Sequence, residues 1–157
     1  MKYSELEKYI KNQSTSLYSF AYTLIPDDLQ ATQLMIDSVS TFLIVNGTHE
    51  LKNISSNQDD EFEEKLILTK LYKHLYEISK KRFIQLESSL KNSESEGPFF
   101  KLNLDEKAVM FLNEKAEFRM EEIAFVLSKT QYETQAILLS SRMNLMNELP
   151  DLVGSHV

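Results

Sequence analysis

Residues 120–148 read MEEIAFVLSKTQYETQAILLSSRMNLMNE and contain two amphipathic helical patterns separated by a short polar turn. Ile123, Ala124 and Leu127 share one face of the first pattern. The second pattern begins after Thr130, which stands three residues before Glu133 in the spacing of a capping box. Two helices joined by a three- to four-residue turn form a helix-turn-helix frame, although any α-hairpin could use the same run.

The rest of the chain predicts an all-α fold. The 157 residues include only three Gly and three Pro, too few for a turn-rich sandwich or barrel, while 42% are apolar, which suffices for a core. The length fits one domain or two very small ones. We therefore expect two helical lobes joined by a flexible linker.

Helix boundaries are predicted from periodicity, caps and breaks. Asp27 with Gln30 and Asn103 with Glu106 repeat the capping spacing. Polar connections are expected at 46–58 and 88–98, the second of which contains Gly97-Pro98. The expected helices are 4–25, 28–45, 59–88, 104–116, 120–127 and 131–148, and the expected organisation is a domain at 1–88, a linker at 89–99 and a domain at 100–149.

The charge distribution limits where a nucleic acid could bind. The chain has 17 Lys and Arg against 24 Asp and Glu, a net charge of -7, which excludes a protein coated in basic residues. Residues 51–100 come closest to neutrality, with eight bases and nine acids. Any anionic partner is therefore expected in the middle third.

The helix expected at 59–88 carries a basic stripe. At 100° per residue, Lys70, Lys73, Lys80 and Lys81 fall within about 120° of one another. Tyr72 and Tyr76 lie at the border between this stripe and the leucine face. Cations beside aromatic rings fit a splayed single strand, and a solvated lysine face with packed aromatics is the alternative interpretation.

Two segments together resemble a known family. Residues 104–146, with Glu106-Lys107, Glu121-Glu122-Ile123-Ala124 and Arg142-Met143-Asn144-Leu145, resemble region 4 of bacterial sigma-70-type factors of the extracytoplasmic-function (ECF) group. Residues 17–43 look like the start of region 2, and 62–83 look like the part that melts and holds the -10 element. The resemblance implies a transcription protein that binds core RNA polymerase and promoter DNA.

The resemblance also implies roles for individual residues. Contact with the polymerase β′ subunit is expected through Gln33, Leu34 and Asp37, although Thr and Gln replace the acids that the family favours in this segment. DNA contact in the N-terminal lobe is expected through Lys70, Tyr72, Lys73, Tyr76, Lys80, Lys81 and Arg82. DNA or partner contact in the helix-turn-helix is expected through Lys129, Gln131, Tyr132, Gln135 and Arg142.

The expected recognition helix has lost most of the family's basic residues. Gln135, Ile137 and Ser140 stand where bases are common, so autonomous DNA binding by this lobe is not expected. The alternative is a sigma-fold interaction module that binds a protein, such as an anti-sigma factor or another partner. Ile137 and Leu138 motivate it, since an exposed apolar residue suits a protein interface.

Other chemistries find no support in the sequence. There is no Cys, and the three His are isolated from one another, so no metal site and no cofactor are expected. Nucleophile and phosphate-binding motifs are missing as well, and we predict a protein that is not an enzyme. No apolar run is long enough to span a membrane, which with the lack of Cys predicts a cytoplasmic location.

Overall fold

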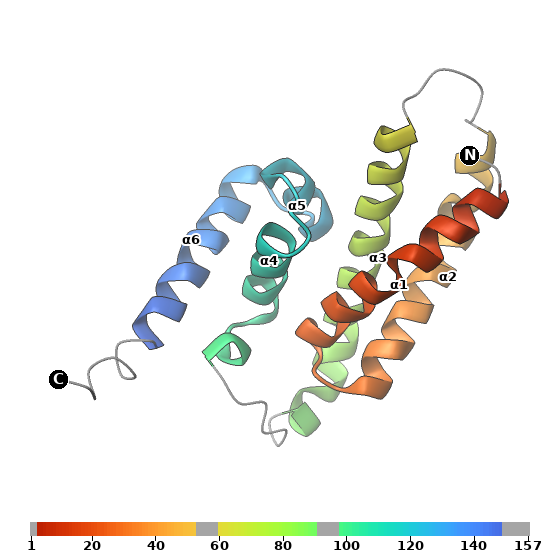
Figure 1. Cartoon of the computed structure of the whole chain (residues 1–157). Helices are drawn as coiled ribbons and strands as arrows, with labels where there is room; N and C mark the ends of the chain where they lie inside the picture. Colours follow the sequence, from red (N-terminus) through yellow and green to blue (C-terminus); the bar gives the residue numbers. More distant parts are fainter. Residues whose placement is uncertain (1–2, 53–59, 91–97, 149–157) are drawn as a thin grey trace. The chain divides into compact units, whose positions relative to one another are not determined.

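The computed structural model describes residues 3–52, 60–90 and 98–148, and all of its regular elements in these ranges are helical (Figure 1). Six α-helices and one 3-10 helix follow one another along the chain. The predicted all-α fold is confirmed. Among the helices described, none is both long and apolar enough to cross a membrane.

By its internal contacts the chain divides into two compact units, Met1–Lys81 and Arg82–Val157. The boundary falls within the third helix, earlier than the linker expected at 89–99. The central part of that linker, 91–97, lies outside the described residues, as does the chain after 148.

The N-terminal unit is built on two helices joined by a tight corner, α1 (Tyr3–Leu24) and α2 (Asp28–Lys52). Asp27 caps α2, because its Oδ1 accepts the N–H of Gln30 at 2.9 Å. The predicted cap at this corner is confirmed. The buried side chains recur at helical spacing on both helices: Leu6, Ile10, Leu17, Phe20, Ala21 and Leu24 on α1, and Ala31, Leu34, Ser38 and Phe42 on α2.

The helix α2 is longer than its sequence predicts. The connection expected from residue 46 begins seven residues later, because α2 continues to Lys52. A single glycine such as Gly47 lowers helix stability by only about 1 kcal/mol, and no proline follows to stop the helix.

The third helix, α3 (Asp60–Leu90), completes the N-terminal core. Its buried residues include Ile67, Leu71, Tyr72, Leu75 and Tyr76. Two polar contacts join α3 to α1: the Tyr9 hydroxyl donates to the Glu64 carbonyl at 3.0 Å, and Ser16 shares a short hydrogen bond with the Tyr72 hydroxyl. The same face therefore supplies both apolar burial and side-chain hydrogen bonds.

The C-terminal unit consists of a 3-10 helix, η1 (Pro98–Lys101), and three α-helices, α4 (Leu104–Glu114), α5 (Met120–Leu127) and α6 (Gln131–Glu148). The predicted capping box opens α4, with the Glu106 N–H 2.9 Å from Asn103 Oδ1 and the Asn103 N–H 3.3 Å from Glu106 Oε1. The other carboxylate oxygen of Glu106 accepts from Asn144 at 2.9 Å. Glu106 thereby connects the start of α4 to α6, and this is why a carboxylate is buried there.

Candidate functional site

The outward side of α3 carries the basic stripe that the sequence predicts. We define the basic face of α3 as Lys70, Lys73, Lys80 and Lys81. Lys80 and Lys81 are exposed, and Lys70 and Lys73 are half-buried. Lys73 Nζ lies 3.7 Å from Glu77 Oε1, a partly exposed pair that salt screens. Arg82 is half-buried and lies outside this arc of the helix.

Tyr72 and Tyr76 do not border an open groove, and this part of the prediction is wrong. Both side chains are buried. The Tyr72 ring packs edge-to-face on Phe20 with centroids 5.0 Å apart, and burial raises the pKa of the Tyr72 hydroxyl. The Tyr76 ring lies beneath Lys80, whose Nζ is 6.0 Å from its centroid. Neither ring offers a face on which a base could stack.

Phe62 supplies the aromatic ring that the basic face lacks. Its side chain is 60% exposed. It precedes Lys73 by eleven residues, which returns a helix to within about 20° of the same direction. The helical spacing could have shown this relation from the sequence.

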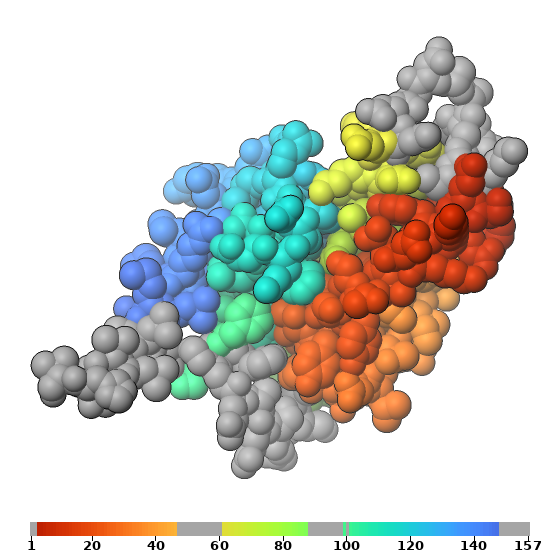
Figure 2. Space-filling model, viewed as in Figure 1, coloured from red at the N-terminus to blue at the C-terminus, as the bar shows by residue number. Residues whose placement is uncertain are grey.

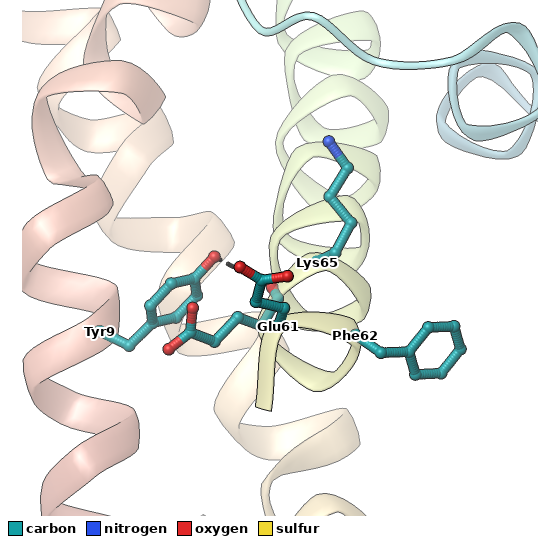
Figure 3. A pocket seen from close by; sticks show the side chains of 5 residues that line it. Tyr9, Glu61, Phe62 and Lys65 are labelled. Atoms are coloured by element: carbon teal, nitrogen blue, oxygen red, sulfur yellow. Dashed lines mark hydrogen bonds between the residues drawn. The ribbon is translucent and has the colours of Figure 1, made fainter. Parts of the chain in front are cut away.

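A pocket of about 530 Å³ lies between α1 and the start of α3 (Figure 3). Tyr9, Glu61, Phe62, Glu64 and Lys65 line it. The Tyr9 hydroxyl faces α3, while the Phe62 ring points away from it. Burial, together with the charge of Glu64, raises the pKa of Tyr9 to about 12. Two carboxylates against one ammonium make this pocket a poor anion site, so we do not assign the nucleic-acid contact to it.

The segment of α2 expected to bind polymerase is partly retained. Leu34 is fully buried in the N-terminal core and is not available to a partner, so this part of the prediction is wrong. Gln33 and Asp37 are at the surface, where Gln33 Nε2 donates to Asp37 Oδ1 at 2.8 Å. Leu29, 82% exposed, and Ile36, exposed as well, lie on the same side of the helix. We call Leu29, Gln33, Ile36 and Asp37 the outer face of α2.

The helices α5 and α6 form the predicted helix-turn-helix geometry. Ser128 ends α5 in the left-handed conformation with φ 54°, and the Lys129 N–H donates to the Ala124 carbonyl at 3.0 Å. Thr130 then caps α6, because its Oγ1 accepts the Glu133 N–H at 3.1 Å. Ile123 is buried with Ala124 at the contact between the helices. The three-residue turn is therefore fixed by backbone hydrogen bonds on both sides.

Both cations expected to contact DNA in this frame are paired with carboxylates of α4. Lys129 Nζ lies 3.7 Å from Asp105 Oδ2, and Arg142 Nη2 donates to Glu114 Oε1 at 3.1 Å. The remaining candidates, Gln131, Tyr132 and Gln135, are exposed on the first turns of α6. The frame is present, but its positive charge is largely neutralised within the unit.

The apolar residues that the sequence assigns to the surface of α6 are different in the structure. Leu138 is buried and Ile137 is half-buried, so the expectation that they form an exposed apolar surface is wrong. The exposed apolar residues of α6 are instead Tyr132, Leu139, Met143 and Met146. Their spacing of four or three residues, or the sum of the two, is a signal that the sequence alone carries.

The described residues hold no group of three or more His, Asp or Glu side chains that could bind a metal ion. His74, the histidine whose side chain is described, instead interacts with Asn46 of α2, with Nδ2 and Nε2 3.2 Å apart. Burial lowers the pKa of His74. This histidine has a packing role in the N-terminal unit.

Comparison with known proteins adds no relative to these observations: no family model, no curated protein and no solved structure matches the chain.

Proposed function

We propose that this chain is a sigma-factor-like transcription protein that associates with core RNA polymerase in the cytoplasm and contacts promoter DNA mainly through α3. The basic face of α3 is the observation that carries the proposal. Its lysines lie on one side of a helix with the exposed Phe62 ring, which fits phosphates and one unstacked base of a single strand.

The outer face of α2 supports the polymerase contact. Leu29 and Ile36 are apolar anchors, and Gln33 with Asp37 forms a polar rim beside them. Apolar anchors with a polar rim are typical of protein–protein interfaces. We assign this face to the polymerase β′ subunit.

Polymerase binding would also offset the acidity of the chain. With a net charge of -7, the protein alone repels DNA. Tethering to a complex already on the promoter raises the effective concentration to about the millimolar range. A basic face too weak to act alone then suffices.

A second candidate follows from the paired cations of the helix-turn-helix. Lys129 and Arg142 are bound to Asp105 and Glu114, which favours a divergent sigma-fold module that binds a protein, such as an anti-sigma factor, and not DNA. In this case polymerase binding, promoter opening or both would be lost.

Capture of core RNA polymerase followed by run-off transcription separates the two candidates. The first predicts both polymerase capture and a specific transcript. Capture without initiation would overturn the first candidate and support the second. For the α2 contact, Ile36→Glu should reduce capture at least tenfold, because it places a charge in an apolar contact. Ile84→Glu, at an exposed isoleucine of α3, is the matched control.

The α3 contact has its own test. The double variant Lys73→Glu, Lys80→Glu should lower run-off transcription at least about tenfold while leaving polymerase capture intact, because phosphate contacts are replaced by repulsion. Lys8→Glu with Lys11→Glu on α1 makes the same change in net charge at exposed positions. Equal effects of the two double variants would remove α3 from the proposal.

A further inference from the structure

The helix α6 is apolar on two opposite faces. Thr134, Leu138 and Ser141 are buried on the inward face, where α6 packs on α4 and α5. On the outward face Tyr132, Leu139, Met143 and Met146 are 84%, 62%, 55% and 66% exposed. A helix that needs only one buried face has polar residues opposite it. The second face therefore indicates a further contact.

The exposed residues follow a heptad spacing. We define the outer seam of α6 as Tyr132, Ala136, Leu139, Met143 and Met146, which are separated by steps of four, three, four and three residues. At 100° per residue these positions lie within an arc of about 80°. This is the spacing with which two helices pack side by side in a coiled coil.

The seam is large enough to matter energetically. Together its large side chains expose on the order of several hundred Å² of mostly apolar surface, the size at which an exposed patch marks an interaction site. The seam runs along most of the 18 residues of α6, which lies at the surface of the C-terminal unit and is drawn in blue in Figure 2.

We propose that the outer seam of α6 pairs with the same seam of a second copy of this chain, with the two helices antiparallel. Antiparallel layers place Ala136 against Leu139 of the partner subunit, and Tyr132 against Met143 of the partner subunit. A parallel, in-register pair would set Ala136 against its own copy and leave a gap between bulky layers. Large against small along the whole seam makes it complementary to itself.

The residues that flank the seam agree with the same pairing. Glu133 and Ser140 lie on one flank, and Gln135 and Arg142 lie on the other. In the antiparallel pair, Glu133 faces Ser140 of the partner subunit, and Gln135 faces Arg142 of the partner subunit. No like charges meet, and the antiparallel helix dipoles attract.

This inference is independent of the proposed polymerase and promoter contacts, which use α2 and α3. It does bear on the helix-turn-helix, because the pairing covers Tyr132 and crowds Gln135. A chain dimerised through α6 cannot place these residues in a DNA groove.

Sedimentation equilibrium of the full chain between about 5 and 500 μM tests the pairing. We expect a monomer–dimer equilibrium with a dissociation constant on the order of 1–100 μM, as suits a small interface. Leu139→Glu and Met143→Glu should each weaken dimerisation at least about 100-fold, because each would bury a carboxylate. Ile84→Glu is the matched control and should leave the constant within twofold. A chain that stays monomeric at 500 μM, or a dimer insensitive to both seam variants, would overturn the proposal.

Cross-linking determines the orientation, since the chain contains no Cys. A short bismaleimide should join a Glu133→Cys chain to a Ser140→Cys chain in a mixture, and each chain alone should cross-link at least tenfold less. Both positions are exposed, so the substitutions should leave the fold intact, which circular dichroism checks. Cross-linking of either chain to itself as efficiently as in the mixture would overturn the antiparallel pairing.

Discussion

Ser128 holds a backbone conformation that disfavours any residue with a side chain. Its φ of 54° lies in the left-handed region, where Cβ approaches the following carbonyl at a cost of about 1–2 kcal/mol. The cost is accepted because the turn between α5 and α6 needs a left-handed residue for its two hydrogen bonds to the end of α5.

Replacing Ser128 by glycine should therefore stabilise the protein. We expect Ser128→Gly to raise the free energy of unfolding by about 1 kcal/mol, measured by urea denaturation. Ser128→Ala keeps Cβ and serves as the control for the lost hydroxyl, so it should give no gain. An equal gain from both variants would show that the hydroxyl, and not the backbone, is unfavourable.

His74 should make the stability of the N-terminal unit depend on pH. Burial lowers its pKa below 6.5, Lys73 and Lys70 act in the same direction, and Glu77 opposes them. The unfolded chain then binds the proton at a higher pH than the folded chain, so stability is lost as the pH falls through about 6.5.

The measurement is the free energy of unfolding at pH 7.5 and at pH 5.5. His74→Gln keeps an acceptor for Asn46 but cannot titrate, so its loss of stability between the two values should be smaller than that of the natural chain. An equal loss in both proteins would show that His74 is not the group responsible.

At the scale of elements, α4 controls the charge of the helix-turn-helix. Asp105 near its start holds Lys129, and Glu114 at its end holds Arg142. Both pairs are partly exposed, so each contributes little to stability. Their effect on function is larger, because they neutralise the cations that phosphates would need.

Releasing these cations should restore DNA affinity to the helix-turn-helix. The double variant Asp105→Asn, Glu114→Gln should bind random duplex DNA severalfold more tightly at low salt, with a salt slope steeper by up to about two, or about one per phosphate contact. Fluorescence anisotropy across a salt series measures both. Glu5→Gln with Glu63→Gln changes the net charge equally in the N-terminal unit, and an equal effect of this control would assign the gain to net charge alone.

At the scale of the whole molecule, charge is distributed so that one basic face stands within an acidic protein. The net charge of -7 opposes DNA at long range, while the basic face of α3 acts only at short range. The molecule is suited to DNA contact after a partner has brought it there.

The free chain should therefore bind DNA poorly. We expect a dissociation constant weaker than about 0.1 mM for a random 20-base-pair duplex at about 150 mM salt, the weak end of non-specific binding. Fluorescence anisotropy with labelled duplex checks this value. Micromolar binding by the free chain would contradict the dependence on a partner.

The sequence by itself determined the helices, because the interactions that start and stop a helix are local. Asp27, Asn103 and Thr130 cap helices whose N–H groups lie three residues away, and each is legible from spacing. The periodicity of the leucines likewise predicts which side of each helix is apolar. Only the end of α2 exceeded its predicted limit, since a polar segment without proline can continue a helix.

Tertiary structure decided which predicted contact residues are available. Leu34, Tyr72 and Tyr76 lie at positions that a helical wheel leaves open, and the neighbouring helices cover them. Arg142 is paired with a carboxylate 28 positions earlier in the chain, a distance at which spacing gives no information. Burial and ion pairing depend on which helices lie beside one another, so the basic face of α3 and the outer seam of α6 became visible only once the helices had packed.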